Sequence, residues 1–195
     1  DGTADRLVDP PADLTTDIAC FGTVSLALEP GASRYAALLK NLHRDGTFIA
    51  LDPNIRPFYA TKAHSDFLYS LLPSVDLLKL SDEEEEFLDQ PEAPIKVITC
   101  GPDGLIVHFN GQTIEVTAPT IEVADTIGAG DTVIGCLLAE IHRRTGGKNV
   151  RSKTMEFAGE DWAEIASYAA RAAAVTCTRV GANPPTRAEM EQLPE

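Results

Sequence analysis

The feature that most constrains the fold of this chain is the alternation of short apolar runs with amphipathic segments. Residues 17–22, 48–51, 75–80 and 95–100 are apolar runs of strand length, each ending at or just before a glycine or a polar residue. Residues 33–44 have helical periodicity instead. One face of that segment carries its large apolar side chains, Tyr35, Leu38, Leu39 and Leu42. This order predicts an α/β fold, a mostly parallel sheet with helices on both faces and right-handed crossovers.

The pattern changes after the fourth predicted strand. Asn110-Gly111 separates two short alternating runs and is a strong hairpin signal, so the sheet is expected to end in an antiparallel part. Two long helices are expected at residues 131–144 and 160–177. Residues 145–159 contain Gly146-Gly147 and are predicted to be an exposed connection between them.

Composition limits the class of protein. A chain of 195 residues fits a single domain spanning residues 1–195. Its 16 basic and 30 acidic residues give a formal charge of −14, which argues against binding to nucleic acid. The sequence contains neither an apolar run long enough to cross a bilayer nor the pattern of a secretion signal. We therefore expect a soluble, cytoplasmic protein that binds small molecules and neither membrane nor nucleic acid.

The cysteines and histidines do not form a metal-binding pattern. Cys20, Cys100, Cys136 and Cys177 are scattered in apolar surroundings, without a Cys-x-x-Cys pair. We interpret them as buried thiols and expect neither a disulfide framework nor a zinc site.

Polar and glycine-containing segments follow several of the predicted strands. In open α/β sheets, ligands bind beyond the carboxyl ends of the parallel strands. Residues 52–56, 79–84, 100–104 and 124–131 are therefore expected to converge on one edge of the sheet. Within them, Ser81 is a plausible N-cap with Glu84 at capping-box spacing, which predicts a short acidic helix over residues 82–88.

The most informative segment is DTIGAGD at residues 125–131, which leads directly into the predicted helix. Gly128, Ala129 and Gly130 leave backbone N–H groups unobstructed at a helix N-terminus, where the helix dipole favours an anion. Asp131 would face such an anion, and a carboxylate there is useful as the base that deprotonates an attacking hydroxyl. The alternative is that Asp131 only caps the helix and that the glycines only close a turn.

DTIGAGD also resembles the signature of the ribokinase-like (PfkB-type) sugar kinases, and the resemblance extends over the chain. Five further segments are similar to stretches of these enzymes, in particular of fructokinases: DGTADRL at 1–7, LDPNIRP at 51–57, LLKLSDEEEEFL at 77–88, VITCGPDG at 97–104 and TRVGANPPT at 178–186.

The resemblance implies the following catalytic roles. Asp131 would be the base that acts on a bound sugar hydroxyl, and the backbone of Gly128, Ala129 and Gly130 would stabilise the transferred phosphoryl group. Arg56 would contact the substrate. Fructose is the expected sugar. 2-Keto-3-deoxygluconate or the substrate of another ribokinase-like kinase is the alternative.

The resemblance also implies binding sites for ATP, Mg²⁺ and a monovalent cation. Glu84 would hold Mg²⁺ through water, and Asp125 resembles a ligand of K⁺, whose requirement the sequence leaves open. The other acidic residues of the helix are interpreted as a solvated face. The residues expected to border ATP are Asn54, Lys79, Ser81, Gly101, Gly104, Gly181, Ala182 and Asn183.

The sequence departs from the family in one respect. The family's first strand, with a sugar-binding aspartate, its Gly-Gly substrate motif and its small lid sheet have no counterpart here, so this chain is expected to be the nucleotide-binding and catalytic portion of a kinase. Two classes of function remain: an ATP-dependent sugar kinase, which could be a homodimer when complete, and a non-catalytic nucleotide-binding module.

Overall fold

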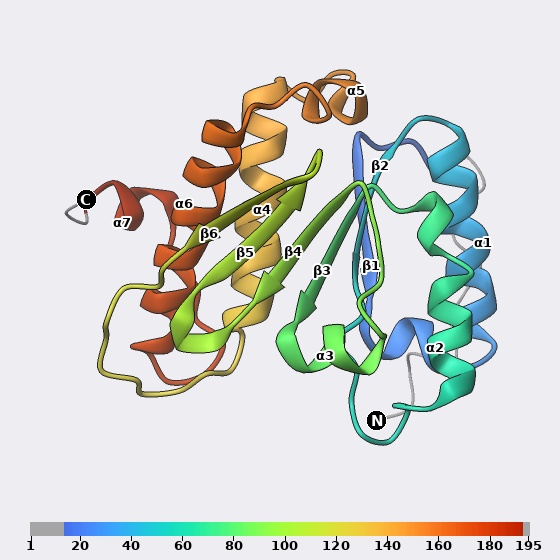
Figure 1. The fold of residues 1–195 in the computed structure, drawn as a ribbon, viewed down its shortest axis with the longest axis horizontal. Coiled ribbons are helices and arrows are strands. Elements are labelled where there is room, and N and C mark those ends of the chain that lie inside the picture. Colours follow the sequence, from blue (N-terminus) through green and yellow to red (C-terminus); the bar gives the residue numbers. More distant parts are fainter. Residues whose placement is uncertain (1–13, 193–195) are drawn as a thin grey trace.

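The computed structural model describes residues 14–192, in which six strands form one mixed sheet in the order β1-β2-β3-β4-β5-β6 (Figure 1). The strands are β1 (Ile18–Gly22), β2 (Phe48–Asp52), β3 (Leu77–Ser81), β4 (Ile95–Thr99), β5 (Leu105–Phe109) and β6 (Gln112–Val116). Strands β1 to β4 are parallel, and β5 and β6 are antiparallel to their neighbours. The predicted parallel sheet with an antiparallel end is confirmed. The DGTADRL segment lies outside the described residues.

Helices cover both faces of the sheet, as predicted. Helices α1 and α2 lie on one side of it and α4 and α6 on the other (Figure 1). The α-helices are α1 (Gly31–Arg44), α2 (Lys62–Tyr69), α3 (Asp82–Phe87), α4 (Ala129–Thr145), α5 (Val150–Thr154), α6 (Gly159–Cys177) and α7 (Arg187–Glu191). Among the described residues, no helix combines the length and apolarity needed to cross a membrane.

Strand β2 shows how the sequence builds two cores. All five of its residues are buried. Phe48 and Ala50 pack in a cluster with residues of α4 and α6, whereas Ile49 and Leu51 pack with residues of α1 and α2. Successive side chains of a strand point to opposite faces, so a strand covered on both sides must be apolar throughout. The continuous apolar runs of the sequence have this cause.

The expectation of an exposed connection over residues 145–159 is wrong in part. Gly146 ends α4 in a left-handed conformation, but the short helix α5 follows. Val150 and Thr154 are buried, and Val150 belongs to the core beside α4 and α6. The apolar side chain of Val150 folds this segment back onto the protein.

The interpretation of the cysteines as buried thiols is also wrong. Cys20 is exposed, and Cys100, Cys136 and Cys177 are half-buried. Within residues 14–192, β1 is at the edge of the sheet, where Cys20 lines an open cavity of about 580 Å³. An edge strand has no neighbour on one side, so its apolar side chains are less completely covered than those of β2.

A polar cluster joins three elements next to the core. The Arg151 guanidinium donates to Asp76 Oδ1 at 2.7 Å and contacts His43 Nε2 at 3.0 Å. Arginine can only donate, so Nε2 of the imidazole is the acceptor and the ring is neutral. Burial lowers the pKa of His43, and the charge of Arg151 lowers it further, against the opposing effect of Asp76.

This cluster makes the stability of the protein depend on pH. The unfolded chain takes up the His43 proton near the ordinary pKa of about 6.5, whereas the folded protein binds it only at lower pH. Stability contributed by neutral His43 should therefore be lost as the pH falls below about 7. We expect the difference in melting temperature between the wild type and His43→Gln to shrink from pH 7.5 to pH 5.5. A difference that is constant with pH, or that grows towards acid, would contradict the assignment.

Candidate active site

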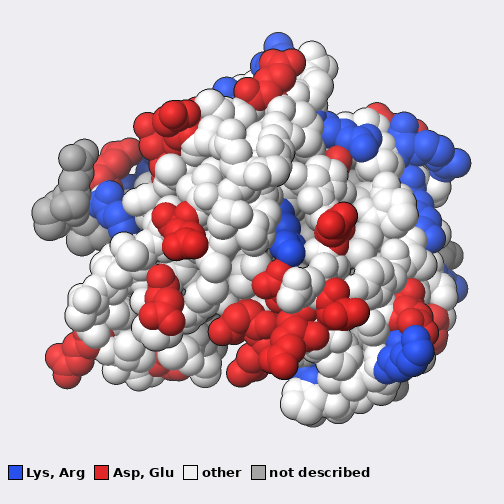
Figure 2. Space-filling view, in the orientation of Figure 1, with Lys and Arg blue, Asp and Glu red and all other residues white. Residues whose placement is uncertain are grey.

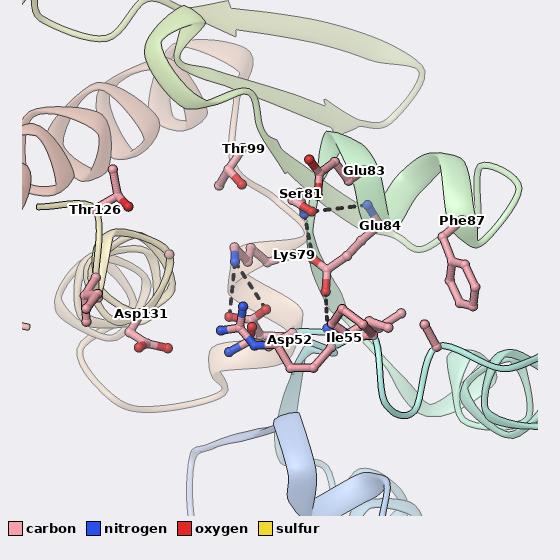
Figure 3. Close-up of a pocket in the computed structure, with 17 residues that line it drawn as sticks. Asp52, Ile55, Lys79, Ser81, Glu83, Glu84, Phe87, Thr99, Thr126 and Asp131 are labelled. Atoms are coloured by element: carbon pink, nitrogen blue, oxygen red, sulfur yellow. Dashed lines mark hydrogen bonds and ion pairs between the residues drawn. The ribbon is translucent and has the colours of Figure 1, made fainter.

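A cavity of about 620 Å³ opens at the carboxyl ends of β2 and β3, opposite the N-terminus of α4 (Figure 3). Three of the four segments expected to converge, residues 52–56, 79–84 and 124–131, contribute to its wall. The lining residues are Asp52, Asn54, Ile55, Arg56, Pro57, Ala60, Lys79, Ser81, Glu83, Glu84, Phe87, Thr99, Thr126, Ile127, Gly128, Gly130 and Asp131.

The N-terminus of α4 depends on a glycine at residue 128. Gly128 is the N-cap, with φ of 82° and ψ of 2°, in the left-handed region that favours glycine. A Cβ at this position would lie 2.8 Å from the Cβ of Ala182. The Gly128 carbonyl accepts from the backbone N and the Oγ1 of Thr132, both at 2.8 Å. The Ala129 N–H donates to the Thr126 carbonyl at 3.2 Å, so the first-turn N–H groups that remain for a ligand are those of Gly130 and Asp131.

Asp131 lies where two cavities meet. It is exposed on the first turn of α4 and lines both the 620 Å³ cavity and the 580 Å³ cavity beside β1. Figure 3 shows the Asp131 side chain directed towards the ion pair of Lys79 and Asp52. A carboxylate in this position can accept a proton from a molecule that reaches it from either cavity.

Lys79 and Asp52 form a buried ion pair at the base of the cavity. The Lys79 ammonium lies 3.2 Å from one Asp52 oxygen and 3.3 Å from the other, and each residue is only 5% exposed. Burial raises the pKa of Asp52 to about 6, and the carboxylates of Glu84 and Asp131 add to this, while Lys79 opposes it. A Cβ on Gly130 would lie 3.0 Å from the Lys79 ammonium. The ammonium therefore abuts the first turn of α4, with Asp52 as its counter-ion.

The predicted capping box at Ser81 and Glu84 is confirmed. Ser81 Oγ accepts from the Glu84 N–H at 3.1 Å, and a Glu84 oxygen accepts from the Ser81 N–H at 2.8 Å. The other Glu84 oxygen accepts from the Ile55 N–H, which ties the loop after β2 to α3 (Figure 3). Glu84 is buried, yet each carboxylate oxygen keeps a further lone pair for a water molecule. The solvated face predicted for the other acidic residues fails at Glu85, which pairs with Lys96 at 2.6 Å.

A mostly apolar groove of about 470 Å³ adjoins the polar cavity and shares Thr99, Thr126 and Gly130 with it. The predicted residues Gly101 and Gly104 line it. A Cβ at Gly104 would lie 2.0 Å from the Val116 carbonyl oxygen, so the close approach of β6 requires glycine there. The volume and mostly apolar lining of the groove are in the range of small-molecule binding sites.

Sequence reasoning missed several residues of the site. Asp52 belongs to the segment 52–56 that the sequence places at the sheet edge, but its pairing with Lys79 is not predicted, although an aspartate at the end of a buried strand is a recognisable signal. The groove is also lined by parts of residues 118–123 and by one face of α6. On α6, small side chains recur at helical spacing and leave room for the groove, a pattern visible in the sequence at Ala170, Ala173, Ala174 and Cys177.

Asp125 and Gly181, both predicted site residues, contact each other. One Asp125 oxygen accepts from the Ile127 N–H at 3.0 Å, and the other accepts from the Gly181 N–H at 2.9 Å. These hydrogen bonds lower the pKa of Asp125. Ala182 lies next to Gly128, but Asp125, Gly181, Ala182 and Asn183 are all missing from the residues that line the cavity and the groove. Asp125 thus joins the loop before α4 to the loop after α6.

The charge around the cavity is mostly negative. Acidic side chains gather over α3, at the edge of the cavity (Figure 2). Asp82, Glu83 and Glu86 are exposed on this helix. Within residues 14–192, no group of three or more His, Cys, Asp or Glu side chains is arranged to hold a metal ion. A cation here would have to be held by few protein ligands, with water or a bound anion completing its shell, as Mg²⁺ commonly is.

The site combines, at one edge of an open α/β sheet, a helix N-terminus, a carboxylate and an apolar groove, an arrangement typical of α/β proteins that bind small molecules. A sequence profile described as "pfkB family carbohydrate kinase" matches residues 16–189, and the chain belongs to this family. The predicted resemblance is thereby confirmed.

Individual relatives agree with the family assignment. The chain is 27% identical to "Probable fructokinase-5" of Arabidopsis thaliana over 191 residues, which cover 89% of this chain and 56% of that protein. It is 32% identical to "Fructokinase" of Rhizobium leguminosarum bv. trifolii over 161 residues, which cover 72% of this chain and 49% of that protein. The chain therefore spans about half the length of these curated relatives.

Solved structures confirm the fold. An uncharacterized sugar kinase from Pyrococcus horikoshii superimposes with a TM-score of 0.76 at 24% identity, covering 91% of this chain and 57% of that one. A fructokinase from Vibrio cholerae O395, solved with fructose, ADP and a calcium ion, has a TM-score of 0.74 at 21% identity, covering 93% of this chain and 61% of that one.

Proposed function

We propose that the protein to which this chain belongs transfers the terminal phosphoryl group of ATP to a primary hydroxyl of a sugar, with fructose as the acceptor. The observation that carries the proposal is the position of Asp131, on the first turn of α4, between the cavity that contains Lys79 and the cavity beside β1. The fructokinases among the relatives support this reaction and this sugar.

The arrangement suits an in-line transfer between the two cavities. Asp131 accepts the proton of the sugar hydroxyl as its oxygen forms a bond to the γ-phosphorus. The bond from the γ-phosphorus to the bridging oxygen breaks, and ADP leaves with that electron pair. The N–H groups of the first turn of α4 and the Lys79 ammonium stabilise the charge on the transferred group. The proton held by Asp131 then passes to solvent.

The polar cavity and the apolar groove divide the nucleotide between them. Phosphates fit the side where Asn54 and Lys79 line the cavity, Arg56 of the same cavity is proposed to contact the substrate, and the adenosine fits the groove beside Gly101 and Gly104. Ser81, which also lines the cavity, is proposed to border the phosphates. The loop with Gly181, Ala182 and Asn183 is proposed to border the nucleotide as well. Thr99 and Thr126, which belong to both spaces, lie at the junction of adenosine and phosphates.

Glu84 is proposed to hold Mg²⁺ through water, and Asp125 to contribute to a K⁺ site. Bound Mg²⁺ would neutralise charge on the phosphates, and the exposed carboxylates of α3 create a negative potential that attracts it. Glu84 is buried at the cavity wall, and its carboxylate oxygens have lone pairs left to accept from metal-bound water, which fits this role.

Replacing Glu84 with glutamine should raise the Mg²⁺ concentration needed for half-maximal activity several-fold, because an amide orients metal-bound water less strongly than a carboxylate. Initial rates at saturating ATP and sugar, measured against Mg²⁺ concentration, test this. The control is Glu86→Gln, an exposed neighbour on the same helix. If both variants shift the Mg²⁺ dependence equally, the acidic run acts only as diffuse charge.

The acceptor is tested by an ATP-consumption screen of the complete protein. The panel contains hexoses, pentoses, keto-acid sugars including 2-keto-3-deoxygluconate, and nucleosides. The proposal expects fructose to give the highest kcat/KM. A preference for another sugar would leave the kinase assignment in place and change only the acceptor. ATP consumption that does not depend on any acceptor would contradict the kinase assignment.

For the 195-residue chain by itself we propose nucleotide binding without sugar phosphorylation, the second class of function. The exposure of Asp131 and the open cavity beside the edge strand β1 favour this, since acceptor orientation needs a closed site. Calorimetric titration with ATP and a fructose-dependent turnover assay on this chain and on the complete protein distinguish the two classes. Light scattering of the complete protein tests whether it is a homodimer.

A further inference from the structure

The loop after α6, which we call the strap (residues 178–186), folds back over the N-terminus of α4. The Gly181 N–H donates to Asp125 at 2.9 Å, and Ala182 approaches Gly128 so closely that a Cβ there would lie 2.8 Å away. Just before the strap, the Cys177 carbonyl accepts from the backbone N–H groups of Ala124 and Asp125, at 2.8 and 3.2 Å. Gly181 and Ala182 of the strap, and Cys177 just before it, therefore contact the loop that forms the proposed phosphate site.

The strap is not held by apolar burial. Val180, its one large aliphatic side chain, is 85% exposed, and most other strap residues are exposed or half-buried. Segments with few buried apolar contacts open locally at low cost in free energy unless other interactions hold them. The position of the strap must then come from polar contacts.

Arg179 supplies those contacts from within the strap. One terminal nitrogen donates to the carbonyl oxygens of Asn183 and Pro184, at 3.4 and 3.5 Å, and the other donates to Glu189 at 2.6 Å. The second oxygen of Glu189 accepts from the backbone N and the Oγ1 of Thr186, at 2.7 and 2.9 Å. The hydrogen bonds from Thr186 and Arg179 lower the pKa of Glu189 to about 2, so this carboxylate is ionised throughout the neutral range.

The strap is anchored independently at its far end. Helix α7 begins directly after it, and Arg187 of this helix contacts the buried carboxylate of Glu140 on α4 at 2.9 Å. Met190 of α7 is buried as well. The strap is thus attached to α6 at one end and to α7 at the other. Between these ends, the contacts of Arg179 and Glu189 hold its backbone in place.

We propose that Arg179 and Glu189 are positioning residues that hold the strap against Gly128 and Asp125 and thereby set the affinity for nucleotide. The inference rests on the proposed function, since it assumes that ATP lies beside this loop. Only arginine has a planar group that reaches two carbonyls and a carboxylate at once. When Arg179 is removed, the strap can leave Gly128, and the Asp125 carboxylate loses its partner in Gly181.

The test compares Arg179→Ala, Arg179→Lys and Glu189→Gln in the complete protein, by steady-state kinetics and by hydrogen exchange. We expect Arg179→Ala to raise the KM for ATP about tenfold, the loss of about 1.4 kcal/mol of binding free energy, with little change in kcat or in the KM for the sugar. Hydrogen exchange should quicken in residues 178–186 and 124–131. Arg179→Lys can keep the ion pair with Glu189 but has no second nitrogen to donate to the carbonyls of Asn183 and Pro184. Its KM for ATP should therefore lie between those of the wild type and Arg179→Ala.

Two matched controls exclude general effects. Arg44→Ala removes an exposed arginine whose contact lies within α1, and Val180→Ser changes the exposed strap residue next to Arg179. Neither should alter the KM for ATP. An Arg179→Ala protein with unchanged KM for ATP and unchanged exchange would overturn the inference while leaving the kinase assignment intact. Equal losses in both KM values and in kcat would also overturn it. A wild-type protein that does not use ATP would instead overturn the proposed function.

Discussion

Replacing Asp131 with asparagine should lower kcat by about 10²–10⁴-fold while ATP binding is retained, because the amide keeps the shape of the side chain but cannot accept the proton of the sugar hydroxyl. Asp131 is exposed at the junction of two cavities, so the substitution disturbs no packed contact of the fold. Turnover at saturating sugar and ATP affinity by calorimetry, both on the complete protein, give the two quantities separately.

The control for this substitution is Asp45→Asn, an exposed aspartate at the C-terminus of α1, where the same chemical change should leave kcat as it is. An Asp131→Asn protein that keeps most of its kcat would show that another group removes the proton. A variant that loses ATP affinity in proportion to kcat would place Asp131 in ground-state binding instead.

Gly128→Ala is expected to have the second large effect, a loss of about 10²-fold or more in kcat/KM. The left-handed conformation of residue 128 is unfavourable for alanine. The added Cβ would also lie 2.8 Å from the Cβ of Ala182, so the strap or the start of α4 must shift. Either shift moves the N–H groups that we propose to face the transferred phosphoryl group.

Gly135→Ala is the matched control, because this glycine lies on the same helix and an added Cβ meets no atom within 4 Å. It should leave kcat/KM unchanged and stabilise α4 slightly, because alanine has the higher helix propensity. Equal kcat/KM in the Gly128→Ala and wild-type proteins, with both folded, would contradict the role given to the α4 N-terminus.

Local patterns predicted most of the fold. The expected strands match β1 to β6 closely, and Asn110-Gly111 forms the turn between β5 and β6, with positive φ at both residues. These predictions succeed because strand alternation, helical periodicity and turn geometry depend on neighbours in the sequence. The expectation of an exposed connection over residues 145–159 was wrong in part, because the burial of Val150 depends on packing against α4 and α6 rather than on neighbours in the sequence.

The site shows the same division. The sequence by itself determined the DTIGAGD loop at the start of α4, the capping box of Glu84 and the convergence of three loops on one sheet edge, because spacing and strand order determine each of them. Only the tertiary structure decided that Lys79 pairs with Asp52 and that Gly181 binds Asp125, 56 residues earlier in the chain. Such pairs need two segments to meet at hydrogen-bond distance, and that distance is a property of how the sheet and its helices pack.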